Sequence, residues 1–248
     1  AAIWDMDGVI ADTAPYHLKA WQEVLQKRDV NFTEEDFRHS FGQRNDTIIK
    51  IALGEEISQN EIEDIACEKE ASFRRRIGQN LKPLPGVMNL VKSLKEHGFK
   101  MALASSAPME NIHLLTKGLA IDSCFHSIIS DKDVTEGKPS PQAFLLAARK
   151  LGVEPRNCVV IEDAVAGVAA AKRAGMRCLA VTNTHPRESL TEADLIVDTL
   201  EEVTMDDLEQ LLNPRRYGSL NMERSLVLIK PDAMERGLAS TIISRLEK

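Results

Sequence analysis

The chain has 248 residues, of which 43% are hydrophobic and 28% are charged. This composition is typical of a globular protein and excludes wholesale disorder, and no apolar run approaches the ~18 residues of a membrane-spanning helix. The net charge is −7, but residues 213–248 carry a balance of +3, which leaves −10 on the rest. The negative charge of residues 1–212 argues against nucleic-acid binding. The first residues form neither a basic segment nor a cleavable apolar run, so we expect a cytoplasmic protein.

Short apolar segments alternate with helical patterns along most of the chain. The predicted strands are residues 3–4, 99–104, 127–129, 158–161, 178–181 and 195–197. The predicted helices are residues 87–97, 109–118, 141–151 and 165–174, with Ser140 as the N-cap before Pro141 at the first helical position and Gly175 at C′. The alternation predicts an α/β fold with a doubly wound, Rossmann-like parallel sheet. Ligands of such a sheet bind at the carboxyl ends of its strands.

Residues 14–83 interrupt this alternation with helical patterns alone. One helix is expected to start at Thr33, and another at Ser58, where Ser58 and Glu61 form an S-x-x-E capping box. We therefore predict a helical cap (14–83) inserted into an α/β core (1–13 and 84–212). The alternative is a helical subdomain with a purely structural role.

Asp5 and Asp7 directly follow the first predicted strand. Two carboxylates at a strand end can act at one site, one as a nucleophile and one as an acid or base, and Gly8 allows the backbone to pass close to a ligand. The alternative is a pair of solvated turn residues.

Three later segments place polar residues at comparable positions. Ser105 and Ser106 follow the second strand and offer hydroxyl and N–H groups to a phosphate, the alternative being an ordinary N-cap. Lys138 precedes a predicted helix, where a solvated surface lysine is the alternative. Glu162 and Asp163 follow an apolar strand, and metal ligation is the favoured interpretation.

The charges of these residues imply a cation. Four carboxylates and one lysine in a single crevice would carry −3, which would repel a phosphate dianion and raise carboxyl pKa values. A divalent cation reduces this charge and also binds a phosphate oxygen. Oxygen ligands alone, and few of them, favour Mg²⁺. The pattern therefore indicates metal-assisted phosphoryl transfer to an aspartate.

With these motifs in order, residues 3–212 resemble the haloacid dehalogenase superfamily of phosphohydrolases, in its β-phosphoglucomutase-like branch. The segment DMDGVIADTAPYHLKAW (5–21) is especially similar to the mutases and the related sugar phosphatases. The resemblance implies that Asp5 is the nucleophile and a magnesium ligand. It implies that Asp7 is the general acid and base and binds the metal through its backbone carbonyl. Ser105 and Lys138 would bind the transferring phosphoryl group, and Glu162 and Asp163 would complete the metal site.

The resemblance also implies substrate-binding residues in and near the cap. Arg44, in Gly42-Gln43-Arg44, matches a substrate-specificity loop in which mutases bind the remote phosphate with an arginine; a solvated helix charge is the alternative. Thr13 and His17 match the branch next to the cap hinge, although His17 can equally be a structural histidine. Ser106 is the remaining expected substrate ligand. The run Arg74-Arg75-Arg76 offers a further anion contact.

The end of the chain has a second resemblance. Residues 222–248 (MERSLVLIKPDAMERGLASTIISRLEK) resemble the start of a nucleoside diphosphate kinase. No histidine follows His185, so the catalytic histidine of that kinase family is missing. We interpret 213–221 as a linker and 222–248 as a truncated kinase-like segment.

From the sequence we therefore expect a magnesium-dependent phosphatase that acts on a small phosphate ester, a sugar phosphate, through a phospho-aspartate. A β-phosphoglucomutase with the same intermediate is the first alternative. A fusion partner that docks a nucleoside diphosphate kinase is the second. The oligomeric state is left open.

Overall fold

The computed structural model describes residues 1–78 and 80–213. Within them the strands are β1 (Ala2–Trp4), β2 (Met101–Ala104), β3 (Ser127–Ile129), β4 (Val159–Glu162), β5 (Arg177–Val181) and β6 (Leu195–Val197). The α-helices are α1 (Ala14–Gln26), α2 (Glu34–Ser40), α3 (Asn45–Leu53), α4 (Gln59–Ile77), α5 (Val87–Glu96), α6 (Met109–Gly118), α7 (Gln142–Leu151), α8 (Val165–Arg173) and α9 (Met205–Leu212). Short 3₁₀ turns connect several of them.

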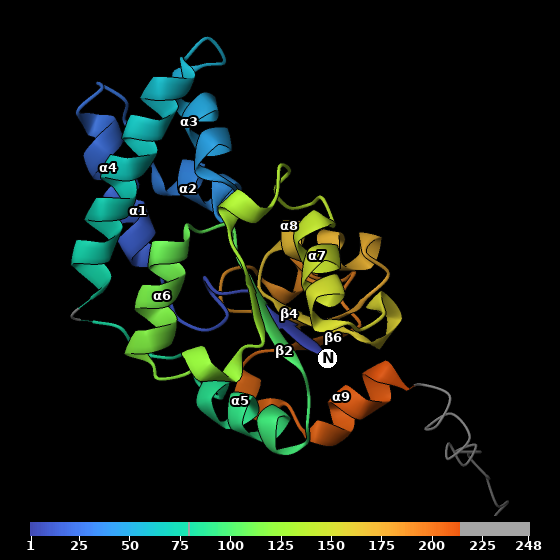
Figure 1. The fold of residues 1–248 in the computed structure, drawn as a ribbon. Coiled ribbons are helices and arrows are strands. Elements are labelled where there is room, and N and C mark those ends of the chain that lie inside the picture. The colour runs from blue at the N-terminus through green and yellow to red at the C-terminus, as the bar shows by residue number, and fades with distance from the viewer. Residues whose placement is uncertain (79, 214–248) are drawn as a thin grey trace, which may run out of the picture. The chain divides into compact units, whose positions relative to one another are not determined.

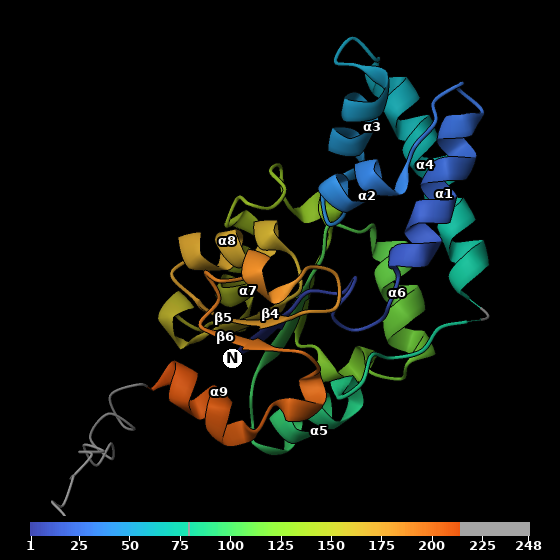
Figure 2. The same cartoon turned by 180° about the vertical axis from the view of Figure 1, so that it is seen from behind.

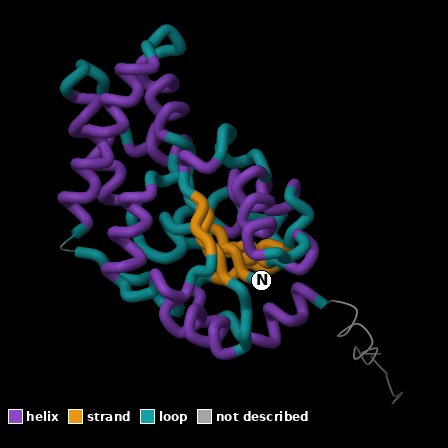
Figure 3. Tube along the Cα trace, in the orientation of Figure 1, coloured by secondary structure: helices purple, strands orange, loops and turns teal. Residues whose placement is uncertain are grey.

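All six strands run parallel in one sheet of order β3-β2-β1-β4-β5-β6. The first strand of the chain is central, because β1 pairs with β2 on one side and with β4 on the other. Figure 3 shows the strands in orange with helices around them. The predicted α/β fold with a doubly wound parallel sheet is therefore confirmed.

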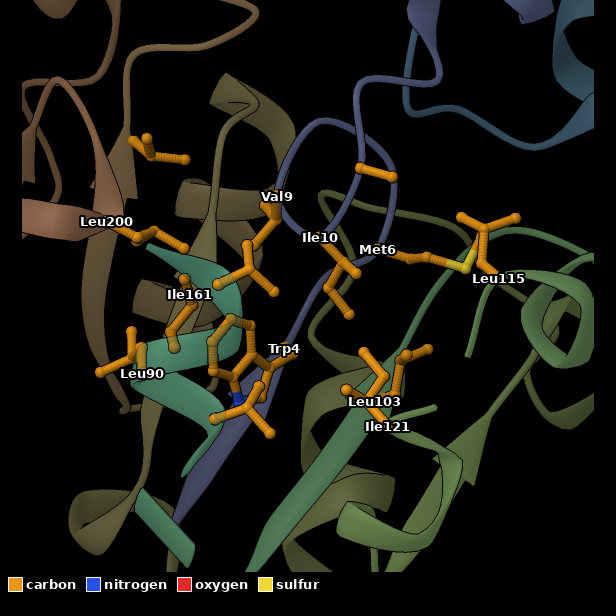
Figure 4. Close-up of a cluster of buried hydrophobic side chains, with 14 of the residues drawn as sticks. Trp4, Met6, Val9, Ile10, Leu90, Leu103, Leu115, Ile121, Ile161 and Leu200 are labelled. Atoms are coloured by element: carbon orange, nitrogen blue, oxygen red, sulfur yellow. The ribbon is translucent and has the colours of Figure 1, made fainter. Parts of the chain in front are cut away.

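Each face of the sheet buries a separate set of side chains. Successive residues of a strand point to opposite faces, so Ala2 and Trp4 pack against α5, α6 and α9, whereas Ile3 packs against α7 and α8. Figures 1 and 2 show these two layers of helices from opposite sides. The close-up in Figure 4 shows Trp4 surrounded by aliphatic residues such as Leu90 and Ile161. Because both faces of β1 are covered, functional groups can reach solvent only from its ends.

Helices α1 to α4 form their own apolar cluster on one side of the core (Figure 1). Trp21, Phe37 and Ile49 are among its buried members. Both expected helix starts are confirmed, because Thr33 and Ser58 each form a capping box at the N-termini of α2 and α4. The predicted run of helices between β1 and β2 is thus present, while its division from the core as a cap, with limits at residues 14 and 83, stays a prediction.

Most predicted elements are present with ends shifted by one or two residues, as expected for fraying termini. The start of α7 is a correction, because Pro141 is its N-cap and the helix begins at Gln142 rather than at Pro141. The Ser140 hydroxyl accepts only a long hydrogen bond, 3.4 Å from the Gln142 amide nitrogen. Gly175 does follow α8 with a positive φ of 71°, as predicted.

None of the described helices combines the length and the apolar character needed to cross a bilayer. The compact unit that contains the sheet and the cap comprises Ala1–Leu212. The predicted linker beyond residue 213 and the kinase-like segment 222–248 lie outside the described residues.

Candidate active site

The polar residues predicted from the strand ends meet at one edge of the sheet. Asp5 follows β1, Ser105 follows β2, and Glu162 is the last residue of β4. The three strands are neighbours in the sheet, so residues that are far apart in the chain come together. All three side chains are buried.

Lys138 joins two of these carboxylates. Its Nζ donates to Asp5 Oδ1 at 2.5 Å and also to Glu162 Oε1. Burial alone would lower the pKa of Lys138, but the two carboxylates outweigh burial and raise it. The lysine is therefore a fixed positive charge next to Asp5.

Asp5, Glu162 and Asp163 form an acidic cluster in which one carboxylate oxygen of each lies within 4.8 Å of the others. Burial raises the pKa of Asp5 to about 7; Lys138 opposes this rise, while Glu162 and Asp7 add to it. Burial and the neighbouring carboxylates raise the pKa of Asp163 as well. Within the described residues, the buried Oδ2 of Asp163 has no hydrogen-bond partner. The donor set and this oxygen fit a hard divalent cation.

Two glycines make room for the acidic cluster. A Cβ at Gly8 would lie 1.9 Å from Asp163 Oδ2, and a Cβ at Gly167 would lie within 1.8 Å of Glu162 Oε1. Real Cβ contacts stay above 3.0 Å, so a larger residue at either position must displace a carboxylate. Gly8 was singled out in the sequence, whereas Gly167 was not.

Asp7 is held apart from the acidic cluster. Its Oδ1 accepts a hydrogen bond from Thr13 Oγ1 at 2.6 Å and lies 3.2 Å from His17 Nε2. Burial alone would raise the pKa of Asp7, but His17 and Thr13 outweigh burial and lower it. The His17 ring stacks on Phe73, with ring centroids 3.9 Å apart. Thr13 and His17, predicted to bind substrate, thus both contact the carboxylate of Asp7.

A cleft of about 480 Å³, its open mouth included, leads to these residues between the core and the cap. The core contributes Asp5, Asp7, Ser105 and Ser106 to its lining. The cap contributes aromatic, aliphatic and polar side chains, namely His17, Trp21, Phe37, Phe41, Gln43, Asn45, Ile48, Lys69 and Glu70.

Ser105 is placed as predicted, but not as a helix cap. It lines the cleft, and its Oγ accepts a hydrogen bond from the Ala107 amide at 3.1 Å. The N-cap of α6 is Pro108. The ordinary-cap alternative therefore does not describe this serine.

Arg44 lies outside the cleft lining. Its guanidinium contacts the Asp46 carboxylate and donates to the carbonyl oxygens of Asp131 and Val134, at 2.9 and 3.0 Å. In this arrangement it ties the cap to a core loop. Its role as a substrate ligand stays a prediction.

The arginine run 74–76 does not line the cleft either. Arg74 donates to Asn111 Oδ1, and Arg75 and Arg76 contact the Glu23 carboxylate. The role of this run as a further anion contact stays a prediction.

Lys69 and Glu70 are functional candidates that the sequence analysis missed. Both are buried in α4 and line the cleft. A signal was available, because Ile62, Ile65, Phe73 and Ile77 recur at helical spacing and Lys69 occupies the same stripe. A lysine in an apolar stripe is a buried charge that needs a partner.

Comparison with known proteins agrees with this geometry. The sequence profile of the haloacid dehalogenase-like hydrolases matches residues 1–175. The chain belongs to this family. It is 34% identical to a β-phosphoglucomutase of Bacillus subtilis over 218 residues, which are 85% of the chain and 94% of that protein. It is 34% identical to a fructose-1-phosphate phosphatase of Escherichia coli over 177 residues, which are 70% of the chain and 92% of that protein.

A solved β-phosphoglucomutase from Clostridium difficile superposes on the chain with a TM-score of 0.81 and 28% identity, covering 88% of the chain and 98% of that structure. The predicted resemblance to this family is confirmed, and so is the prediction that the chain is an enzyme. A haloacid dehalogenase-like hydrolase with an acidic cluster of this kind is suited to a metal ion. Its relatives include both phosphatases and a phosphomutase of sugars.

Proposed function

We propose that this haloacid dehalogenase-like enzyme is a magnesium-dependent phosphatase of sugar phosphates that works through a phospho-aspartate. The observation that carries the proposal is the contact of Lys138 with Asp5 beside Glu162 and Asp163. A carboxylate held by a lysine in the lining of a cleft is arranged for nucleophilic attack on phosphorus.

In the first half of the reaction, Asp5 attacks the phosphorus atom and the sugar oxygen leaves. Lys138 and the Ser105 hydroxyl stabilise the charge that develops on the phosphoryl oxygens. In the second half, water attacks the phospho-aspartate and releases inorganic phosphate. Both halves need a group that moves a proton to or from the oxygen opposite Asp5.

Asp7 is our candidate for that group. Held by Thr13 and His17 as a carboxylate, it is in the form that accepts a proton from the attacking water. To protonate the sugar oxygen in the first half it must itself carry a proton, which the nearby phosphate dianion favours by raising its pKa.

Asp5, Glu162 and Asp163 would hold the magnesium ion. When bound, the ion supplies positive charge that keeps Asp5 ionised and offsets the charge of the phosphate. Without a cation the raised pKa of Asp5, about 7, leaves a large fraction of this nucleophile protonated at neutral pH. The need for an ionised nucleophile supports the metal.

The cleft supports a small polar substrate. Its lining includes both aromatic side chains, such as Trp21 and Phe37, and amides, such as Gln43 and Asn45. Sugars present both apolar faces and hydroxyl groups, so this combination suits them. Phosphatases of phosphorylated carbohydrates among the relatives support the same substrate class.

A β-phosphoglucomutase is the second candidate, supported by the relative from Bacillus subtilis. A mutase must also bind the phosphate that does not react, which calls for a free cation at the far end of the cleft. The arginine expected there, Arg44, contacts Asp46 and two core carbonyl groups instead. This arrangement favours the phosphatase. The third candidate, a docking partner of a kinase, would not require the site to be complete.

The test is to measure phosphate release from glucose 6-phosphate, fructose 1-phosphate and an aryl phosphate, with and without Mg²⁺. In parallel, formation of glucose 6-phosphate from β-glucose 1-phosphate is measured with the 1,6-bisphosphate as primer. Steady phosphate release supports the phosphatase. Rapid isomerisation with little free phosphate supports the mutase, and the absence of both activities supports the docking role.

A further inference from the structure

The pair Lys69–Glu70 is an ion pair in the wall of the cleft. Lys69 Nζ donates to Glu70 Oε1 at 2.7 Å, and the two side chains are only 4% and 7% exposed. The ammonium group also lies 5.0 Å from the centre of the Trp21 ring, within range of a cation–π contact. The pair is therefore desolvated and fixed in place.

The Glu70 carboxylate accepts hydrogen bonds from three side chains, that of Lys69 included. Asn45 donates to its Oε1 at 2.8 Å, and Asn111 of the core donates to its Oε2 at 2.5 Å. Burial alone would raise the pKa of Glu70, but Lys69, His17 and the hydrogen bonds from Lys69 and Asn45 together outweigh burial and lower it to about 2. Glu70 is thus a carboxylate at neutral pH, and its charge cancels that of Lys69.

This cancellation decides the charge of the cap side of the cleft. Among the described residues that line the cleft, Lys69 is the one lysine or arginine. Arg44 contacts Asp46 outside the lining, and Arg74 contacts Asn111. Within the described part of the chain, the cap side of the cleft therefore offers no uncompensated lysine or arginine to a ligand group beyond the reacting phosphate.

We infer that Glu70 is a specificity-determining residue: by neutralising Lys69 it makes the cap side of the cleft accept the uncharged, hydroxyl-bearing end of a sugar monophosphate and reject a second phosphate. A hydroxyl group is uncharged, so it can lie beside this neutral ion pair without electrostatic repulsion. A phosphate dianion only accepts, and next to Glu70 it meets a like charge. The inference rests on the proposed function, of which it names the substrate subclass.

The test compares kcat/KM for glucose 6-phosphate with that for glucose 1,6-bisphosphate, and fructose 1-phosphate with fructose 1,6-bisphosphate. Wild type should prefer each monophosphate. Glu70→Gln removes the negative charge but keeps an oxygen that can accept from Asn111, so it should raise the bisphosphate-to-monophosphate ratio at least about tenfold. A ratio unchanged within twofold in a folded variant would overturn the inference.

Two control variants separate charge from structure. Glu23→Gln makes the same substitution on a cap carboxylate outside the cleft lining, and Asn111→Ala removes a hydrogen bond from Glu70 but not its charge. Both should leave the ratio within twofold of wild type. An equal rise in either control would contradict a role for the Glu70 charge.

A second variant keeps the test decisive if Glu70→Gln does not fold. Lys69→Met leaves Glu70 without its cation, so the bisphosphate-to-monophosphate ratio should fall at least about tenfold. An unchanged or higher ratio would overturn the inference. Calorimetric binding of the same sugar phosphates separates the two proposals. Tighter bisphosphate binding by Glu70→Gln in an enzyme that hydrolyses none of them would refute the phosphatase and retain the role of Glu70.

Discussion

Gly167→Ala tests whether the packing of α8 against the acidic cluster is needed for the site. Gly167 is the third residue of α8, and an added Cβ would lie 1.8 Å from Glu162 Oε1 and 2.4 Å from Oε2. To restore a contact of at least 3.0 Å, the carboxylate or the helix must move by about 1 Å or more.

The magnitude follows from the hydrogen bonds at stake. Glu162 Oε2 accepts from the backbone amides of Asp163 and Ala164 at 2.8 and 2.9 Å. Losing both charged hydrogen bonds costs about 3–6 kcal/mol, whereas replacing glycine by alanine in a helix contributes about 1 kcal/mol of stability. The steric effect is larger, so we expect a net loss of about 2–5 kcal/mol in the free energy of unfolding.

The catalytic effect should be separable from the loss of stability. Displacing Glu162 also disturbs Lys138 and through it Asp5, and a misplacement of about 1 Å can lower turnover on the order of 100-fold. The assay combines denaturant unfolding with phosphate release well below the unfolding transition. Gly78→Ala, at the end of α4 with a right-handed helical φ of −55°, is the matched control and should retain full turnover. A Gly167→Ala enzyme as stable and as active as wild type would refute the reasoning.

Three further predictions address the nucleophile, the metal and the buried ion pair. Asp5→Asn should abolish phosphate release while the fold persists, because an amide cannot attack phosphorus; near-wild-type release measured alongside a native circular-dichroism spectrum would exclude the covalent mechanism. Excess chelator should abolish activity, and Mg²⁺ but not Ca²⁺ should restore it fully, since Ca²⁺ takes looser and higher coordination; activity that persists in chelator would contradict a metal at the acidic cluster. Glu70→Gln should lower the free energy of unfolding by about 3 kcal/mol at pH 7, because the folded-state pKa of about 2 lies below the ordinary value of 4.5. A carboxylate with a lowered pKa contributes its full stabilisation above pH 4.5 and loses it as the pH falls towards 2. The free energies of unfolding of wild type and Glu70→Gln should therefore converge near pH 2. A difference at pH 2 as large as at pH 7 would contradict a lowered pKa of Glu70.

The strand-end motifs could be predicted because their geometry is a property of parallel sheets. Asp5, Ser105 and Glu162 each follow or end a short apolar strand, and such strand ends share one edge. Lys138 was predicted as a site residue from its position in the order of the family's motifs along the chain. Its contact with two carboxylates depends on how the loop before α7 folds, which no local pattern reports.

Side chains of the cap were harder to predict, because their direction depends on tertiary packing. Arg44 has the residue type and the position expected for a phosphate ligand, yet its guanidinium contacts Asp46 and core carbonyl groups. The apolar stripe of α4 marks Lys69 as a buried charge. Its partner and the hydrogen bonds of Glu70 with Asn45 and Asn111, from two other helices, depend on tertiary packing. Long polar side chains can extend in several directions from one backbone position.

The central place of β1 in the sheet has a consequence for how the enzyme is made. The partners of β1 begin at Met101 and Val159, whereas the apolar cluster of α1 to α4 is drawn from a single continuous stretch of the chain. Contacts close in sequence form faster than distant ones, and a ribosome adds roughly 5–20 residues per second. The cap helices can therefore fold on the nascent chain before β4 exists, because β4 is synthesised roughly 8–30 s after Asp5. Until then β1 has only β2 as a partner, and the site proposed around Asp5 lacks Glu162 and Asp163. The nascent protein would therefore not yet have the proposed phosphatase activity.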